Sequence, residues 1–296
     1  MNHTEPRSWR VFRYATLVFL VIVFLLPLVW VLQTSFKGDA EIFSQPPKFV
    51  PLPEATTQGL DEEGFLATFA YTPTLVHYRQ VFMEFPFFRY LVNTFIVVIF
   101  TVIGTLLSCT MVAYALACLR WPDRQLVFAL VLATLLLPYP VTLIPLYMLY
   151  RGLGWIDTFL PLIIPQFLAP SFFVFLLRQH FITIPRSMLD AARVDGAGEM
   201  RILWQIIAPQ SKPALLTVTI FSAMWAWNDF LGPLIYLNSE EKKTLAVGIQ
   251  SMVSESATEW GLLMAAGTLM IVPILILFFF AQRYFIQGFT LSGTKG

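Results

Sequence analysis

The sequence predicts an all-α integral membrane protein that crosses the bilayer about six times. Hydrophobic residues make up 57% of the chain and charged residues only 12%, whereas an ordinary soluble domain carries about 25% charged residues. Charge is also nearly absent from six long stretches, and a helix needs about 20 apolar residues to cross the hydrocarbon core. The six stretches, each of 20 to 30 residues, are 14–36, 90–119, 125–150, 158–177, 213–239 and 260–282.

The first stretch could be read as a signal peptide, because Arg7, Arg10 and Arg13 precede it. Its apolar run is longer than that of a signal peptide, and no small-residue cleavage site follows it. We therefore expect an uncleaved first transmembrane helix over 14–36, after a short cytoplasmic N-terminus over 1–13.

The distribution of Lys and Arg predicts the orientation. If both ends are cytoplasmic, the inner segments hold 12 of the 19 basic residues and the much longer outer loops hold 7, as the positive-inside rule favours. The predicted division is an external loop over 37–89, a five-helix transmembrane core over 90–285, and a cytoplasmic tail over 286–296.

Several classes of chemistry find no support in the sequence. A net charge of +1 gives no indication of nucleic-acid binding, and His3, His77 and His180 lack metal-binding spacing. Cys109 and Cys118 lie in one stretch, about 13.5 Å apart along a helix, which is too far for a disulfide. We predict no catalytic residue and no metal site.

Prolines interrupt the later stretches, and each removes a backbone donor and tends to kink its helix. Kinked membrane helices occur along transport paths, where water or protein satisfies the freed carbonyls, but they occur in packed bundles as well. The prolines are Pro138, Pro140, Pro145, Pro161, Pro165, Pro170, Pro233 and Pro273.

The longest inner segment, 178–212, is amphipathic and does not look like a simple connector. Ser187 is placed to cap a helix over 187–195, with Asp190 three residues later. Gly196 can supply the left-handed turn that ends this helix. A second helix is predicted over 199–207.

Pro209 and Pro213 are expected to stop the second helix before the fifth stretch. Ile202 and Ile206 share one of its faces, as do Leu203 and Ile207. The segment could bury these apolar residues under its own bundle, or it could dock into a groove on another protein.

At this segment the chain resembles the EAA loop of bacterial ABC-importer permeases. The resemblance rests on DAARVDGA at 190–197, IIAP at 206–209 and KP at 212–213. Asp190 stands where the family usually has Glu, so the carboxylate reaches about one methylene less far. Within a coupling loop at 181–212, the resemblance implies that the ATPase-coupling residues are Asp190, Ala191, Ala192, Asp195, Gly196, Ile206 and Pro209.

The resemblance extends over about 89–296 and is closest to the MalG-like subunits of the carbohydrate-uptake branch, through LP at 137–138, WNDF at 227–230 and TLAVG at 244–248. It implies a type I importer in the bacterial inner membrane. The implied partners are a second, MalF-like permease subunit, two ATPase subunits, an external solute-binding protein and a carbohydrate. This chain would bind no cofactor; ATP and Mg²⁺ would sit on the ATPase.

The residues themselves agree with a separate motor, because the sequence contains no G-x-x-x-x-G-K-[ST] phosphate loop. A stand-alone ion-coupled secondary transporter is the alternative. It should show ionisable groups near the midplane and repeat symmetry, and only Asp229 fits. An intramembrane enzyme would need paired catalytic groups or a metal cluster, which the stretches lack.

Asp229 is the single charge within the six stretches, and intramembrane carboxylates usually mark function. Trp225, Trp227 and Asn228 lie beside it, and aromatic rings and amides suit sugar recognition. We take these four as candidate residues of the translocation path. The alternatives are an interfacial tryptophan belt and, for Asp229, a hydrogen bond to unwound backbone near Pro233.

Overall fold

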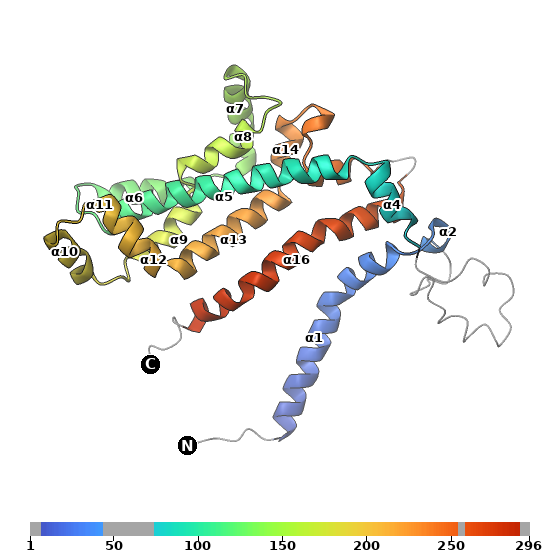
Figure 1. Cartoon of the computed structure of the whole chain (residues 1–296), viewed down its shortest axis with the longest axis horizontal. Helices are drawn as coiled ribbons and strands as arrows, with labels where there is room; N and C mark the ends of the chain where they lie inside the picture. Colours follow the sequence, from blue (N-terminus) through green and yellow to red (C-terminus); the bar gives the residue numbers. More distant parts are fainter. Residues whose placement is uncertain (1–6, 44–73, 254–257, 291–296) are drawn as a thin grey trace. The chain divides into compact units, whose positions relative to one another are not determined.

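The computed structural model describes residues 7–43, 74–253 and 258–290, and these are helical with no strand among them. The predicted ends at 1–6 and 291–296 and most of the external loop lie outside the described residues. The chain divides into two compact units, one comprising 1–87 with 249–272 and the other 88–248 with 273–296. The helices are labelled in Figure 1.

The first unit holds the start of the chain and the beginning of the last helix. Its described elements are α1 (Arg7–Thr34), α2 (Asp39–Ile42), α4 (Val76–Met83) and the first part of α16 (Trp260–Thr290). The buried His77 ties them together, since Nε2 lies 2.9 Å from the Lys37 carbonyl. Its ring packs so closely on Gly261 that no Cβ would fit there. The predicted external loop thus contains two short helices that pack on the chain next to them.

The second unit carries the candidate sites. Its elements up to the amphipathic segment are α5 (Phe87–Ala117), α6 (Arg124–Thr134), α7 (Tyr139–Gly152), α8 (Leu160–Ile163), η2 (Ile164–Leu168) and α9 (Ser171–Phe181). They are followed by α10 (Arg186–Val194), α11 (Glu199–Ile202), η3 (Leu203–Ile207), α12 (Ala208–Gln210), α13 (Lys212–Asn228), α14 (Leu231–Tyr236), η4 (Glu240–Lys242) and α15 (Leu245–Gln250).

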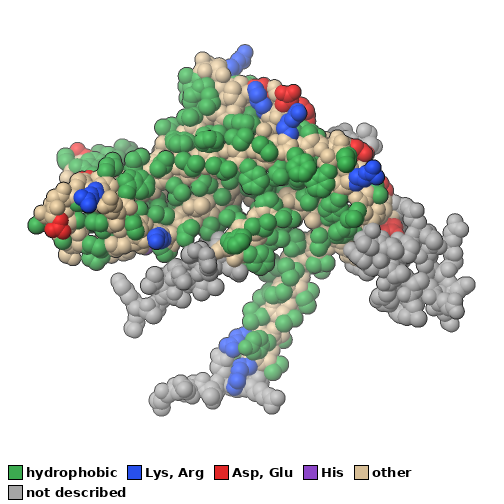
Figure 2. All heavy atoms as spheres, in the orientation of Figure 1, with side chains coloured by type: hydrophobic (Ala, Val, Ile, Leu, Met, Phe, Trp, Pro, Cys, Tyr) green, Lys and Arg blue, Asp and Glu red, His purple; other side chains and the backbone are tan. Residues whose placement is uncertain are grey.

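Over the residues that it describes, the structure confirms the all-helical, strongly apolar character (Figure 2). Fewer helices there than predicted are long enough to cross a membrane alone. Over the described ranges, four helices qualify by length and composition, and a fifth does if a bent pair is counted as one span. The four are Trp9–Thr34, Phe87–Ala117, Leu160–Phe181 and Trp260–Phe280. The third and fifth predicted stretches are each divided into two helices, and the fourth is interrupted at Ala169, which has φ +57° between η2 and α9.

Proline explains both divisions. In a continuous α-helix a proline ring meets the carbonyl of the residue four positions earlier. Pro138 therefore opposes helix at Thr134, where α6 ends, and α7 leaves at 96° to it. Pro233 likewise opposes helix at Asp229, and α13 ends at Asn228 after 17 residues, about 25 Å.

One end of the second unit is held together by polar contacts. Asn93 Nδ2 donates to the carbonyls of Glu241 and Lys243, both at 2.9 Å, and Tyr90 donates to the Glu240 carboxylate. Asp157 accepts from the backbone N–H of Ser239 at 2.9 Å. Residue 157, before the fourth stretch, and residues 239–243, after the fifth, lie on the outer side in the predicted orientation, and both are held at this end.

The opposite end contains the main hydrophobic core. Buried side chains of α5, α9 and α13 meet those of α10, α11 and η3. Tyr114, Leu177, Leu189 and Ile202 are each 4% exposed or less. Figure 1 shows α6, α9, α10 and α11 gathered at this end. The loops predicted to be internal and external thus separate to opposite ends of the unit.

We expect Asp157→Ala to loosen the loop at 238–242. Hydrogen bonds from the Ser239 hydroxyl (2.5 Å) and backbone N–H hold the pKa of Asp157 well below its usual range. Losing a charged acceptor costs about 1.5–3 kcal/mol, so amide exchange at Asn238 and Ser239 should accelerate about tenfold or more at pH 7.

The stability of this loop should depend on pH through Asp157. A depressed folded-state pKa stabilises the loop above the unfolded value of about 3.9, and the stabilisation disappears as the pH falls through the folded pKa. Asp157→Asn is the control, because it retains an acceptor oxygen and should show a smaller effect. Equal exchange in the wild type and Asp157→Ala would contradict this role.

Candidate functional site

The structure forms the amphipathic segment 181–212 as a helix, a tight turn and a second helical stretch. The first helix, α10, lies within one residue of the predicted bounds at each end. Gly196 has φ +81°, so it supplies the predicted left-handed turn. Its N–H donates to the Arg193 carbonyl at 3.0 Å. This turn sets the direction in which the second helix leaves.

Two local predictions for this segment were wrong. Ser187 makes no capping bond, because α10 begins one residue earlier with Pro185 at its cap; Pro185 fixes φ without needing a side-chain acceptor. Pro209 does not stop the second helix, which continues to Gln210. A π-helical turn over Leu203–Ile207 precedes the proline, and such wider turns are a known means of accommodating a break in helical bonding.

Arg193 connects the two helices of the segment. Its guanidinium donates to Asp190 at 3.0 Å and, through Nε and Nη2, to both carboxylate oxygens of Glu199 at 2.9 and 3.3 Å. Glu199 also accepts from the Tyr114 hydroxyl of α5. The hydrogen bonds from Arg193 lower the pKa of Glu199. The turn at Gly196 is thus closed by a charged clasp that is anchored to α5.

The two faces of the segment differ in character. One face packs into the core through Leu189, Ala192, Ile202 and Ile207. On the other face Val194 is 88% exposed and Met200 63% exposed. Of the predicted coupling residues Ile206 is half-buried, while the exposed ones are Asp190, Ala191, Asp195, Gly196 and Pro209.

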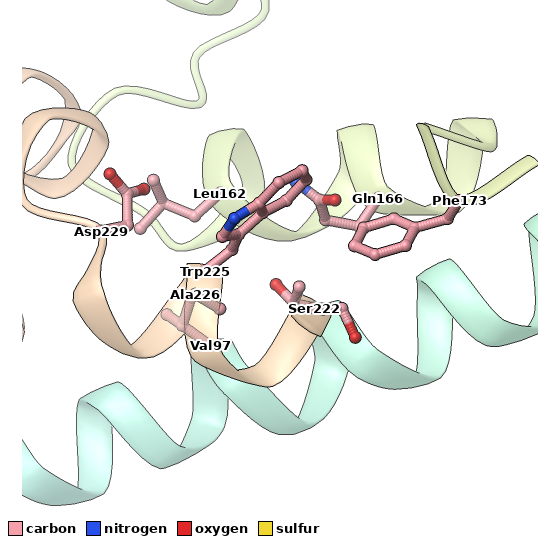
Figure 3. A pocket seen from close by; sticks show the side chains of 9 residues that line it. Val97, Leu162, Gln166, Phe173, Ser222, Trp225, Ala226 and Asp229 are labelled. Carbon is pink, nitrogen blue, oxygen red and sulfur yellow. The ribbon is translucent and has the colours of Figure 1, made fainter. Parts of the chain in front are cut away.

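A cavity of about 250 Å³ is lined by residues of α5, α9 and α13, the helices that also form the core beside segment 181–212 (Figure 3). One wall is a face of α13 with Ser222, Trp225 and Ala226 at helical spacing, and Asp229 continues this wall directly after the helix ends. The other walls come from α5, α8, η2 and α9 through Val97, Thr101, Leu162, Gln166 and Phe173. Polar and aromatic groups therefore converge on one small space.

Two of the four predicted path residues line this cavity and two do not. Trp225 packs against Phe173 with ring centroids 5.1 Å apart, and Asp229 lies at one end of the cavity (Figure 3). Trp227 is 5% exposed and packs on Phe95 at 5.3 Å. Asn228 is exposed, and its amide donates to the Met224 carbonyl at 2.8 Å.

Asp229 makes a hydrogen bond to unwound backbone near Pro233, which is its predicted alternative role. Its Oδ1 accepts the Gly232 N–H at 3.1 Å, at the break before Pro233. A Cβ on Gly232 would lie 2.6 Å from Oδ2, so glycine permits this close approach. The carboxylate therefore caps α14 and borders the cavity at the same time.

Sequence reasoning missed Thr101, Gln166 and Ser222 as polar lining groups. Ser222 lies seven residues before Asp229, so helical spacing could have placed it on the same face. Gln166 follows Pro165 in a 3₁₀ turn, and nothing in its local sequence predicts which way that turn directs it.

The known proteins that this chain resembles are membrane components of transport systems. The family described as "Binding-protein-dependent transport system inner membrane component" matches residues 110–290. The arabinooligosaccharides transport system permease protein AraQ of Bacillus subtilis (strain 168) is 37% identical over 210 residues, which cover 71% of this chain and 74% of that protein. The sn-glycerol-3-phosphate transport system permease protein UgpE of Yersinia pestis is 30% identical over 284 residues, which cover 95% and 96%.

A solved structure shares the fold along nearly the whole chain. It is a bacterial ABC transporter involved in the import of the acidic polysaccharide alginate, and one of its chains superposes with a TM-score of 0.77 at 26% identity over 95% of this chain and 99% of its own. The fold is that of the permease subunits of ABC importers. The chain belongs to the binding-protein-dependent transport system inner membrane components, and it is a membrane permease subunit rather than an enzyme.

We predict that Asp229→Asn changes the transport rate but leaves assembly intact. Asparagine keeps an oxygen for the Gly232 N–H, so α14 stays capped while the charge at the cavity is lost. Uptake by cells and the yield of assembled complex measure the two effects separately. Asp229→Ala removes both properties and should lower the yield as well. Unchanged uptake in Asp229→Asn would leave Asp229 with the capping role alone.

Proposed function

We propose that this chain forms half of the translocation path of an ATP-driven, binding-protein-dependent importer in a bacterial inner membrane, with both ends cytoplasmic. A second, MalF-like permease subunit supplies the other half. Two ATPase subunits hold the ATP and Mg²⁺, and an external binding protein delivers the solute. Family membership supports this assembly, since the matching description is of a binding-protein-dependent system.

The observation that carries the coupling role is the two-sided character of segment 181–212. Its inner face joins the core of this chain, and its outer face keeps Val194 and Met200 exposed beside the charged clasp. A connector that only packed under its own bundle would have no reason to expose these apolar side chains. A short amphipathic helix seated in a groove uses such anchors. We assign the groove to the ATPase subunit.

The clasp gives the segment a mechanical connection to the membrane helices. Arg193 and Glu199 are bonded in a bidentate geometry, and Glu199 is bonded to Tyr114 of α5. Force applied to α10 therefore reaches α5 through polar contacts, and it reaches α13 along α11, η3 and α12 and across the turn at Ser211. The ATPase can shift the permease between states only if its contacts differ between those states.

We propose a carbohydrate as the solute, either an oligosaccharide or a polyol or glycerol phosphate. The names of the relatives include an arabinooligosaccharide and a glycerol-phosphate system. The cavity offers an aromatic face at Trp225 and hydrogen-bonding groups at Gln166, Ser222 and Asp229, which is the chemistry that sugars need. At about 250 Å³ it is smaller than a typical ligand pocket, as expected of half a path.

Reconstitution into vesicles tests the function. The permease with its ATPase and binding protein should move radiolabelled sugar when ATP is supplied on the ATPase side, and hydrolysis should accompany uptake. The permease subunits alone should move none. Uptake by this chain alone under an ion gradient would replace the proposal with an ion-coupled secondary transporter.

The turn at Gly196 gives a sharper test of coupling. A left-handed conformation costs an L-residue about 1–2 kcal/mol, so Gly196→Ala should lower co-purification of the ATPase roughly 5- to 30-fold. Gly196→Pro should abolish it, since proline cannot adopt φ +81° and lacks the N–H bonded to Arg193. Membrane insertion should remain normal.

Gly154→Ala is the matched control, because Gly154 has φ +70° and likewise nothing within 4 Å of an added Cβ, but lies in the loop after α7. This variant carries similar strain and should keep its ATPase. A normal yield of ATPase with Gly196→Pro would rule out the coupling role of the turn.

A further inference from the structure

A basic hollow lies where the corner between α5 and α6 meets the start of α10, beside the clasp and apart from the cavity. It has a volume of about 490 Å³ and is lined by Arg120, Arg124 and Arg186 together with Trp121, Asp123, Gln125 and Leu126. The three arginines against one aspartate leave the lining with an excess of two positive charges. None of the roles assigned above uses these groups.

The corner is held in a fixed shape. Arg124 Nη1 donates to the Leu119 carbonyl at 2.9 Å and so caps the end of α5. The Trp121 indole donates to the Ala115 carbonyl at 3.0 Å. Asp123 turns the chain into α6 with φ +60°. The hollow therefore exists before any ligand arrives.

Nearby acidic groups do not neutralise it. Asp190 and Glu199 lie in the adjoining hollow, which shares Arg120 and Trp121 with this one. Both of these carboxylates are bonded to Arg193, at 3.0 and 2.9 Å. Arg193 offsets one of their two negative charges, and over the two hollows together four arginines against three carboxylates leave one excess positive charge for an anion.

An apolar strip continues from the hollow along α6. Leu126 lines the hollow and is 60% exposed, and Leu130, one turn later on the same face, is 59% exposed. Val127 beside them is 37% exposed. A positively charged recess that leads directly onto exposed leucines matches a molecule with an anionic head and a hydrocarbon tail.

We propose that this corner binds an anionic phospholipid of the cytoplasmic leaflet, with its phosphate at Arg120 and Arg186 and an acyl chain along Leu126 and Leu130. Basic pockets at the cytoplasmic ends of transmembrane helices bind such headgroups, and Trp121 is placed where tryptophan anchors a membrane interface. The inference rests on the proposed orientation, with the α5–α6 corner on the cytoplasmic side. It does not depend on the coupling role or on the solute.

Lipid retention tests the site. The full chain, purified with its associated subunits, is placed in nanodiscs of equal phosphatidylglycerol and phosphatidylethanolamine, extracted in mild detergent and examined by native mass spectrometry. Phosphatidylglycerol should be retained preferentially. Each arginine near a membrane surface contributes about 1 kcal/mol, so Arg120→Gln and Arg186→Gln should each weaken retention about fivefold, and the double variant about 25-fold.

Lys212→Gln is the matched control, because it removes one exposed positive charge outside the hollow and should retain the lipid normally. A photoactivatable phosphatidylglycerol should label residues 120–130 in the wild type and not in the double variant. Leu130→Asn, which keeps every arginine, should also lower retention because it removes acyl-chain contact.

Equal retention of the two lipids, or normal retention by the double variant, would overturn the proposal. Loss of an associated subunit from the double variant with unchanged lipid retention would assign the hollow to a protein interface instead. Retention is measured without ATP or sugar, so failure of the transport proposal would leave this result unaffected.

Discussion

The architecture of the second unit depends on one constraint, which is that a backbone polar group freed inside an apolar bundle must find a partner. Proline creates such groups at set positions, four residues before itself. The ends of α6 at Thr134 and of α13 at Asn228 follow from Pro138 and Pro233. The second break also starts a new helix, α14, whose first N–H groups lack helical partners, and the Asp229 side chain accepts the Gly232 N–H. The same break puts a carboxylate at the edge of a cavity, so the structural device and the candidate site are one feature.

The proposed coupling role places a different requirement on the amphipathic segment, which would have to be fixed to its own bundle and still present a surface to another protein. The sequence left packing under the bundle and docking as alternatives. In the structure one face of the segment is buried in the core through Leu189 and Ile202, and another face leaves Val194 and Met200 exposed. The clasp of Arg193 with Asp190 and Glu199 fixes α10 relative to α11. Ion pairs this exposed add little stability alone, so their value lies in fixing the geometry.

Local sequence rules succeeded where one residue type decides the backbone and failed where several solutions compete. Gly196 could be placed at a left-handed turn because few other residues tolerate it. The cap at Ser187 was wrong because Pro185 begins the helix one residue earlier. The six apolar stretches predicted a membrane protein correctly, but hydropathy cannot show that Pro138 and Pro233 divide two of them. Trp227 and Asn228 adjoin Asp229 in sequence, yet helical rotation places them off the cavity face that Ser222 and Trp225 share.

The two candidate sites are connected by helices that belong to both. α5 carries Tyr114, which is bonded to the clasp, and Thr101, which lines the cavity, about 20 Å apart by the helical rise. α13 begins directly after the amphipathic segment and carries Ser222 and Trp225 on the cavity wall, with Asp229 directly after its end. α5 contains no proline between Thr101 and Tyr114, and the proline of α13 lies in its first turn. Each helix can therefore move as a rod. A displacement of the clasp would therefore reach the α5 and α13 walls of the cavity together. The η2 wall is itself bonded to α5, because the Ser108 hydroxyl donates to the Gln166 carbonyl at 3.0 Å and accepts the Ala169 N–H at 3.1 Å.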